Sequence, residues 1–136
     1  MSYAVGDVVA ERTVHLTRES LVRYAGASGD FNPIHYRDDV AASVGLPGVL
    51  AHGMLTMGLA SSVVVSALDP AARILDYGVR FTKPVVVDPV NGAEVQVLAK
   101  VGAVDDEAVR IDLTVRFNDT TVLVKAQLRV AVDSAR

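Results

Sequence analysis

Hydrophobic and polar residues alternate along most of the second half of the chain, as in strands that bury one face. The alternating runs are residues 73–82, 93–101, 109–117 and 122–130, and the turns between them are Asn91-Gly92, Asp105-Asp106 and Asn118-Asp119. A period of two places every second side chain on the same face of a strand. The pattern therefore predicts consecutive antiparallel strands, and residues 1–16 are expected to add an edge strand.

The stretch from Ala51 to about Ala67 is apolar on almost every side and has no period of two. It is also longer than a usual strand, so a helix is predicted, although the β-branched run Val63–Val65 would suit a strand as well. A helix without a polar face has to be buried. Shorter helices are expected at 18–27, after an N-cap at Thr17, and at 38–44, before Gly45.

A sheet with one apolar face and a long helix without a polar face can bury their apolar surfaces against each other. The economical arrangement is an α+β layer in which the antiparallel sheet wraps around the central helix. At 136 residues the chain is long enough for one core and too short for two ordinary domains. We therefore expect a single domain, residues 1–136.

Composition narrows the function classes. There is no cysteine, which excludes disulfides and thiolate chemistry. The net charge of −3 comes without a basic run, so a nucleic-acid partner is not expected. The beginning of the chain lacks a basic region followed by an apolar one, and the apolar stretch is interrupted and too short to span a bilayer. These features predict a cytoplasmic protein with no membrane partner.

Candidate chemistry concentrates in Ser28-Gly29-Asp30-Phe31-Asn32-Pro33-Ile34-His35. Pro33 keeps Asp30 and His35 off a helix, so the two side chains are free to converge. A carboxylate beside an imidazole can orient it, tune its charge and share a water with it. The alternative is an Asp that only caps a turn through its downstream backbone, and the spacing by itself favours that alternative.

A second candidate lies at the start of the apolar helix, where His52 precedes Gly53. Free N–H groups at a helix start favour negative charge, and glycine lets a ligand reach the backbone, as in an oxyanion hole. Gly53 could equally serve close packing against the sheet. His52 itself is most simply a buried, hydrogen-bonded histidine, although an orienting role is the alternative.

Other chemistries fit the sequence less well. Asp30, His35 and His52 do not have the spacing of a known metal-ligand pattern, so no metal is expected. Neither Ser61 nor Ser62 lies in a nucleophile-elbow motif. There is no glycine loop of the kind that holds phosphates, and no cofactor is expected.

Three segments together resemble the MaoC-like, (R)-specific enoyl-thioester hydratases. They are Tyr24-Ala25-Gly26, the D-x-N-P-x-H core from Asp30 to His35, and Ala51-His52-Gly53-Met54-Leu55. The run AHGMLTMG (51–58) is also similar to the catalytic β subunit of mycobacterial 3-hydroxyacyl-carrier-protein dehydratases. The resemblance follows the order of elements along the whole chain and implies a hot-dog fold, in which a sheet wraps a long helix.

The resemblance implies a hydro-lyase: water adds reversibly to a trans-2-enoyl thioester of coenzyme A or acyl carrier protein, or leaves an (R)-3-hydroxyacyl thioester. It implies that Asp30 and His35 hold the catalytic water and move protons, and that Asn32 supports them. It places the thioester oxygen on the Gly53 N–H and lets Ser61 orient the carboxylate, with Ser62 in that role if the register slips by one.

Two other functions remain open from the sequence. A hot-dog acyl thioesterase is one, although residues 53–66 contain no carboxylate to act as a base. A non-catalytic carrier-binding subunit of a heterodimeric dehydratase is the other, although such a subunit has no chemical need for both Asp30 and His35. A lone curved sheet would expose an edge and an apolar rim, so a homodimer, or a heterodimer with a related hot-dog subunit, is expected.

Overall fold

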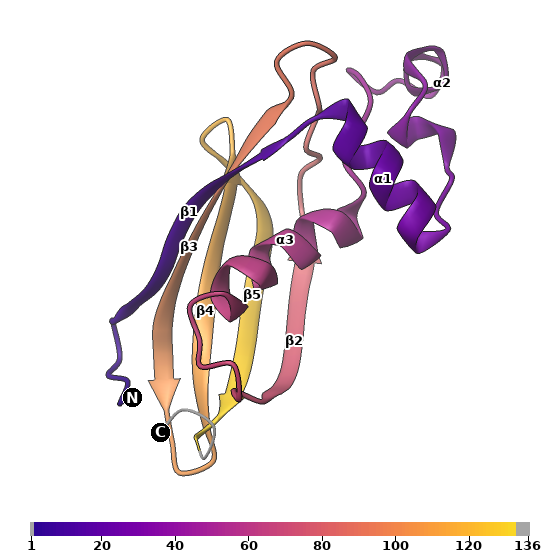
Figure 1. The fold of residues 1–136 in the computed structure, drawn as a ribbon. Coiled ribbons are helices and arrows are strands. Elements are labelled where there is room, and N and C mark those ends of the chain that lie inside the picture. Colours follow the sequence, from indigo (N-terminus) through magenta and orange to yellow (C-terminus); the bar gives the residue numbers. More distant parts are fainter. Residues whose placement is uncertain (1, 133–136) are drawn as a thin grey trace.

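A five-stranded antiparallel sheet curves around one helix in a computed structural model that describes residues 2–132 (Figure 1). The strands are β1 (Val8–Leu16), β2 (Ile74–Phe81), β3 (Ala93–Val104), β4 (Ala108–Phe117) and β5 (Thr120–Ala131). The helices are α1 (Arg18–Ser28), α2 (Asp38–Ser43) and α3 (Gly53–Val65), with a 3₁₀ turn, η1, at Pro33–His35. The predicted α+β architecture is confirmed, and α3 is a helix despite its valine run.

The order of strands in the sheet is β1-β3-β4-β5-β2. The three C-terminal strands form the predicted meander, and β1 is the predicted edge strand. The prediction that all four later strands neighbour one another in sequence order is wrong, because β2 pairs with β5 and not with β3. The connection from β2 to β3 contains Pro84 and Pro89 and is too long for a tight hairpin, so it can cross to the other side of the sheet.

The core lies between α3 and the concave face of the sheet. Alternate residues of β3 and β4 point into it in register, with Val97 opposite Val115 and Val101 opposite Ile111. Helix α3 presents Leu59, Ala60, Val63 and Val64 to this face, and all four are buried. Burial of such apolar surface is the main stabilising contribution of the fold.

Helix α3 is not buried on every side, contrary to the prediction. Met54 is 59% exposed and Val65 is 49% exposed. One sheet can cover only one side of a helix, so the opposite side of α3 faces outwards in the isolated chain. The part of the chain described, residues 2–132, contains no helix that is long and apolar enough to cross a membrane.

Helices α1 and α2 pack beyond one end of the sheet, next to the start of α3 (Figure 1). Thr17 caps α1 as predicted: its hydroxyl accepts from the Ser20 N–H, and the Ser20 hydroxyl accepts from the Thr17 N–H. Gly29 ends α1 with φ of 76°, a left-handed conformation that glycine adopts without strain. The loop that carries Asp30 therefore starts at a defined point.

Tyr77 of β2 fixes α3 to the sheet, because its hydroxyl donates to the Met57 carbonyl at 2.7 Å. Burial raises the pKa of Tyr77 to about 12. Since an unfolded tyrosine ionises near pH 10, the unfolded state loses this proton first as the pH rises. The stabilisation from neutral Tyr77 is therefore complete below about pH 10 and is lost as the pH rises through 12.

We expect Tyr77→Phe to lower the free energy of unfolding by about 1 kcal/mol at pH 8, the usual value of such a hydrogen bond. The difference from the wild type should shrink between pH 10 and 12, because phenylalanine has no proton to lose. Urea unfolding of both proteins at pH 8 and pH 11 measures this, and a difference that grows at pH 11 would contradict the assignment.

Candidate active site

The loop between α1 and η1 is built from short polar side chains that bond to their own backbone. The Asp30 N–H donates to the Ser28 hydroxyl (3.1 Å), the Asn32 N–H to Asp30 Oδ1 (3.1 Å) and the Ile34 N–H to Asn32 Oδ1 (3.2 Å). Asp30 thus does cap a turn, as the structural alternative proposed. Only one of its carboxylate oxygens is needed for that bond, and the side chain is exposed, so the second oxygen can serve another purpose.

His35 is buried at the end of η1, and one hydrogen bond fixes its ring. Nδ1 lies 2.7 Å from the Leu50 carbonyl oxygen, which can only accept. Nδ1 therefore carries the proton, and the neutral ring keeps its free lone pair on Nε2. An imidazole in this tautomer can accept a proton at Nε2 while a backbone carbonyl holds its orientation.

His52 lies directly against His35. Its side chain is 1% exposed, and its ring stacks on the His35 ring with centroids 3.9 Å apart. Nε2 of His52 lies 3.1 Å from the Asp30 carbonyl oxygen, and the Tyr24 ring makes a T-shaped contact with the His52 ring. The interpretation of His52 as a buried, hydrogen-bonded histidine is confirmed. Burial lowers the pKa of His52, and the nearby His35 contributes to the same effect.

The structure brings Asp30 and His35 together. A carboxylate oxygen of Asp30 and ring nitrogens of His35 and His52 all lie within 4.8 Å of one another. Between the Asp30 carboxylate and His35, no direct hydrogen bond is found in the described chain. Two hydrogen bonds of about 2.8 Å that meet at one water span about 4.6 Å. A separation of that length falls within the 4.8 Å limit for these atoms.

The same three residues are poorly arranged for a metal ion. A histidine binds a metal in the plane of its ring, with nitrogen about 2.0–2.1 Å from the ion. The His35 and His52 rings are stacked with only 22° between their planes. Two nearly parallel stacked rings cannot both point a lone pair at one ion without turning, so this cluster does not fit a metal centre as it stands.

Gly53 begins α3 beside this cluster. The Leu55 and Thr56 N–H groups bond to the His52 carbonyl, whereas no acceptor within residues 2–132 meets the Gly53 or Met54 N–H. Unpaired N–H groups at a helix start carry partial positive charge. They face a position where an anion or a developing oxyanion would be stabilised.

A cavity of about 330 Å³ joins His35 to Gly53. Its other walls come from the end of β2, the segment after it, α3 and β5, chiefly Phe81, Lys83, Val85, Thr56 and Leu123. These lining residues were not predicted from the sequence. For the lining residues at the end of β2 and just after it, the available sequence signal was the end of the alternating pattern at Lys83-Pro84. For Thr56 the signal was its position one helical turn after Gly53.

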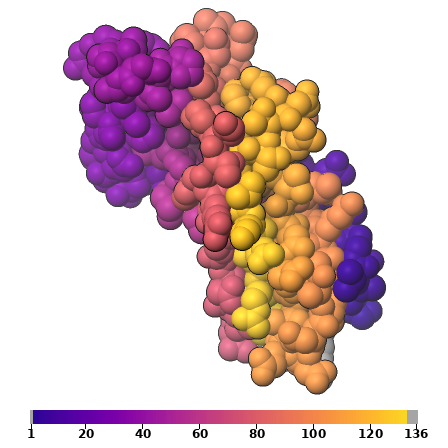
Figure 2. Space-filling model, turned by 180° about the vertical axis from the view of Figure 1, so that it is seen from behind, coloured from indigo at the N-terminus to yellow at the C-terminus, as the bar shows by residue number. Residues whose placement is uncertain are grey.

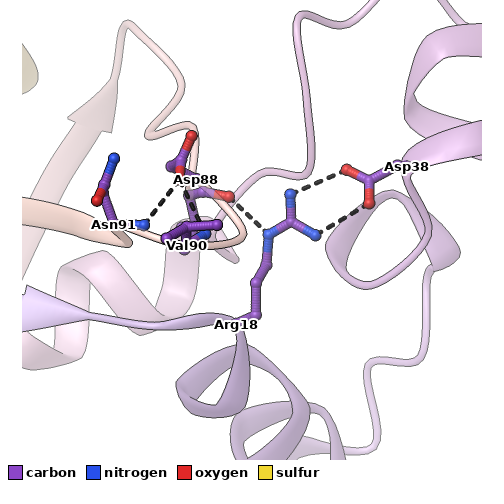
Figure 3. A network of polar contacts seen from close by, with 6 residues as sticks. Arg18, Asp38, Asp88, Val90 and Asn91 are labelled. Atoms are coloured by element: carbon purple, nitrogen blue, oxygen red, sulfur yellow. Dashed lines mark hydrogen bonds and ion pairs between the residues drawn. The ribbon is translucent and has the colours of Figure 1, made fainter.

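Arg18 anchors the segment that supplies this wall (Figure 3). Its Nε donates to the Val87 carbonyl at 2.6 Å, and its guanidinium forms a double contact with Asp38 at 2.9 and 3.2 Å. The ion pair lowers the pKa of Asp38. Arg18 thereby links α1, α2 and the segment after β2 to one another.

Ser61 lies farther along α3. Its hydroxyl donates to the Gly58 carbonyl at 2.9 Å, within its own helix, and no hydrogen bond to Asp30 or His35 occurs in the described residues. Eight residues separate Ser61 from Gly53, about 12 Å along the helix axis. Ser62, the alternative, is exposed. An orienting role for Ser61 stays a prediction.

The model of the MaoC like domain matches residues 3–126. This chain belongs to the MaoC-like domain family. The family match covers every helix of the structure and most of the sheet, including each residue of the candidate site. The expected resemblance is therefore confirmed at the level of the family.

Characterised MaoC-like proteins with similar sequences act on acyl thioesters. The chain is 37% identical over 79 residues to 3-hydroxyacyl-thioester dehydratase X of Mycobacterium tuberculosis, which covers 58% of this chain and 27% of that protein. It is 31% identical over 97 residues to the (R)-specific enoyl-CoA hydratase of Rhodospirillum rubrum, which covers 71% of this chain and 62% of that protein. The matched part thus spans less than two thirds of each relative.

The fold agrees with a solved member of this group. The R-hydratase PhaJ1 of Pseudomonas aeruginosa superposes with a TM-score of 0.82 at 28% identity, over 94% of this chain and 81% of that one. The hot-dog fold expected from the resemblance is confirmed by this match.

The contact between Gly53 and Phe81 can be tested with a matched pair of variants. A Cβ added to Gly53 would lie 3.0 Å from the Phe81 ring, whereas one added to Gly58 would meet nothing within 4 Å. We expect Gly58→Ala to raise the free energy of unfolding by about 0.5–1 kcal/mol. Gly53→Ala should raise the free energy of unfolding by less, because its new methyl group would press against the Phe81 ring.

Urea unfolding measures both variants, and Phe81→Ala provides the control background. The shortfall of Gly53→Ala should disappear when Phe81 is already alanine. If Gly53→Ala behaves the same in both backgrounds, Gly53 and Phe81 are not in contact.

Proposed function

We propose that this MaoC-like domain hydrates trans-2-enoyl thioesters and, in reverse, dehydrates (R)-3-hydroxyacyl thioesters in fatty-acid metabolism. One observation carries the proposal: His35 and Gly53, whose N–H meets no acceptor in the described chain, line one cavity, and a ring nitrogen of His35 lies within 4.8 Å of an Asp30 carboxylate oxygen. The characterised relatives with these activities support the same assignment.

Asp30 and His35 would hold the reacting water between them. In hydration, the pair takes a proton from this water as its oxygen bonds to C3, and a proton is delivered to C2. Dehydration reverses both transfers. His35 Nε2 has the lone pair that such a base needs, because Nδ1 is committed to Leu50.

The start of α3 would stabilise the intermediate. When oxygen adds to C3, negative charge moves through C2 to the thioester oxygen, and the Gly53 N–H with the dipole of α3 would bind that charge. A single oxyanion donor of this type is worth about 3 kcal/mol where its removal has been measured. No cofactor is needed, because the thioester itself polarises the alkene.

Asn32 would support the reaction by keeping the loop in shape. Its side chain caps η1 through the Ile34 N–H at 3.2 Å, which fixes where His35 leaves the turn. The acyl group would lie against the apolar part of the cavity, and the thioester arm would leave towards either coenzyme A or an acyl carrier protein.

The assay that tests this function follows the loss of enoyl absorbance with short and long trans-2-enoyl thioesters, each on coenzyme A and on a carrier protein. Hydration of any of them supports the proposal. Release of free thiol without hydration would identify a thioesterase, and binding without turnover would identify a carrier-binding subunit. Either result would overturn it.

We expect Asp30→Asn and His35→Ala each to reduce hydration by at least about 10²–10⁴-fold, because each removes one partner of the acid–base pair. Asn keeps an oxygen for the Asn32 N–H, so the loop should persist. Asp106→Asn and His15→Ala are matched controls, since both side chains are exposed and lie outside the site. Wild-type turnover in either site variant, with an intact unfolding transition, would rule out the pair.

We also propose that the chain pairs with a second hot-dog chain, of its own kind or a related one. The outer edge of β2 has no partner in the described chain, and its Ile74, Leu75 and Phe81 are 38%, 41% and 53% exposed. Met54 and Val65 add the open side of α3. A second chain would cover this apolar surface and continue the sheet.

Light scattering at micromolar concentration tests the pairing, and we expect at least twice the monomer mass. Leu75→Lys, on the exposed edge, should shift the mass towards the monomer, whereas Val90→Lys, in the exposed turn before β3, should not. A monomeric wild-type protein would contradict the proposal.

A further inference from the structure

The side chain of His52 contacts both members of the proposed pair, the backbone of Asp30 and the ring of His35. We infer that His52 is a positioning residue, which holds the Asp30 backbone through Nε2–H and the His35 ring through its face. The inference rests on the proposed function for its activity readout, but the geometry it describes can be measured without any substrate.

The hydrogen bond from His52 to Asp30 is the bond that connects residues 30–32 of the described chain to an element distant in sequence. Every other hydrogen bond of residues 30–32 in the described chain goes to a residue close by in sequence. Only His52 Nε2–H, at 3.1 Å from the Asp30 carbonyl, connects these residues to a distant element. Without it, the loop would keep its internal shape but lose its fixed position relative to α3.

The contact with His35 complements the bond from Leu50. The Leu50 carbonyl fixes one edge of the His35 ring, and the stacked His52 ring, 3.9 Å away, fixes its plane. Tyr24 makes a T-shaped contact with His52, with ring centroids 4.7 Å apart, so the His52 ring is itself packed against a second aromatic ring. The orientation of His35 Nε2 is thus determined from two sides.

The hydrogen bond also assigns the tautomer of His52. A carbonyl oxygen only accepts, so Nε2 carries the proton and Nδ1 keeps a lone pair. Nδ1 is buried and has no hydrogen-bond partner in the described residues. Leaving a buried polar atom unpaired lowers the stability of the folded state. A ring needed only for packing would avoid this cost as phenylalanine, so the cost indicates that the Nε2–H bond is what the position requires.

His52 has to stay neutral to do this. The groups that face it are the Asp30 carboxylate, the His35 ring and the Tyr24 ring. A second proton would sit on Nδ1, buried and without an acceptor, and would place a charge against His35. Burial lowers the pKa of His52 in the folded state below the ordinary value of 6.5. The stability that comes from a neutral His52 is therefore complete above about pH 6.5 and is lost as the pH falls through the lowered pKa of the folded state.

Two variants separate the contributions of His52. His52→Phe keeps the stacked ring and loses the donor, whereas His52→Gln keeps a donor and loses the ring. Because the donor positions Asp30, we expect His52→Phe to lower kcat by about 10–100-fold, with KM within about threefold. His52→Gln should recover part of this loss. Wild-type kcat in a folded His52→Phe would overturn the inference.

Nitrogen-15 NMR of the ring nitrogens provides the readout that packing alone would not move. In the wild type at pH 8, His52 should carry its single ring proton on Nε2, and amides of residues 30–32 should exchange faster with solvent in His52→Phe. A proton on His52 Nδ1, or unchanged exchange, would overturn the inference. If the wild type hydrates no thioester, the proposed function fails while these spectra still decide the role of His52.

Discussion

The site depends on one short extended segment, Val49–Ala51, which bonds on both sides. On one side, the Val87 N–H donates to Val49 and the Ala51 N–H to Val85, each at 2.9 Å. On the other, the Leu50 N–H donates to Ile34, and the Leu50 carbonyl accepts from His35 Nδ1. The backbone groups of successive residues point in opposite directions, as in a strand. Leu50 can therefore bond to residues 34 and 35, while Val49 and Ala51 bond to the segment after β2 that lines the cavity.

This segment also leads directly into His52 and Gly53. A displacement of Leu50 would therefore move the His35 ring, the His52 ring and the start of α3 together. The anchoring of residues 85–87 by Arg18 belongs to the same assembly, because Val87 bonds to both Arg18 and Val49. The proposed catalytic geometry thus depends on backbone groups of residues 49–51 and 85–87, to which the side chains of His35 and Arg18 are hydrogen-bonded.

Much of the fold followed from local sequence patterns, because helices and strands are encoded by short periods and caps. Thr17, Gly45 and the alternation in β3 to β5 predicted element bounds to within a few residues. The position of β2 beside β5 could not be predicted in this way. It depends on which strands meet across the core, and no local period records that choice.

For the candidate site too, the sequence indicated some residues but not the contacts between segments that are distant in sequence. The D-x-N-P-x-H pattern indicated Asp30 and His35, and the glycine at the helix start indicated Gly53, because residue type alone limits their chemistry. The contacts between His52 and the loop join residues far apart in sequence, so no pattern could show them. One signal existed: histidine occupies an N-cap position where Ser, Thr, Asp or Asn is preferred, and its side chain makes no cap bond.

The stacked histidines explain how one small site can hold two imidazoles with different roles. Both rings bond to a backbone carbonyl, but through different nitrogens: His35 through Nδ1 and His52 through Nε2. His35 lines the cavity and keeps its free nitrogen for a substrate water, whereas the free nitrogen of His52 is buried. In the proposed mechanism, access to the cavity, which His35 has and the buried Nδ1 of His52 lacks, would assign the proton transfers to His35.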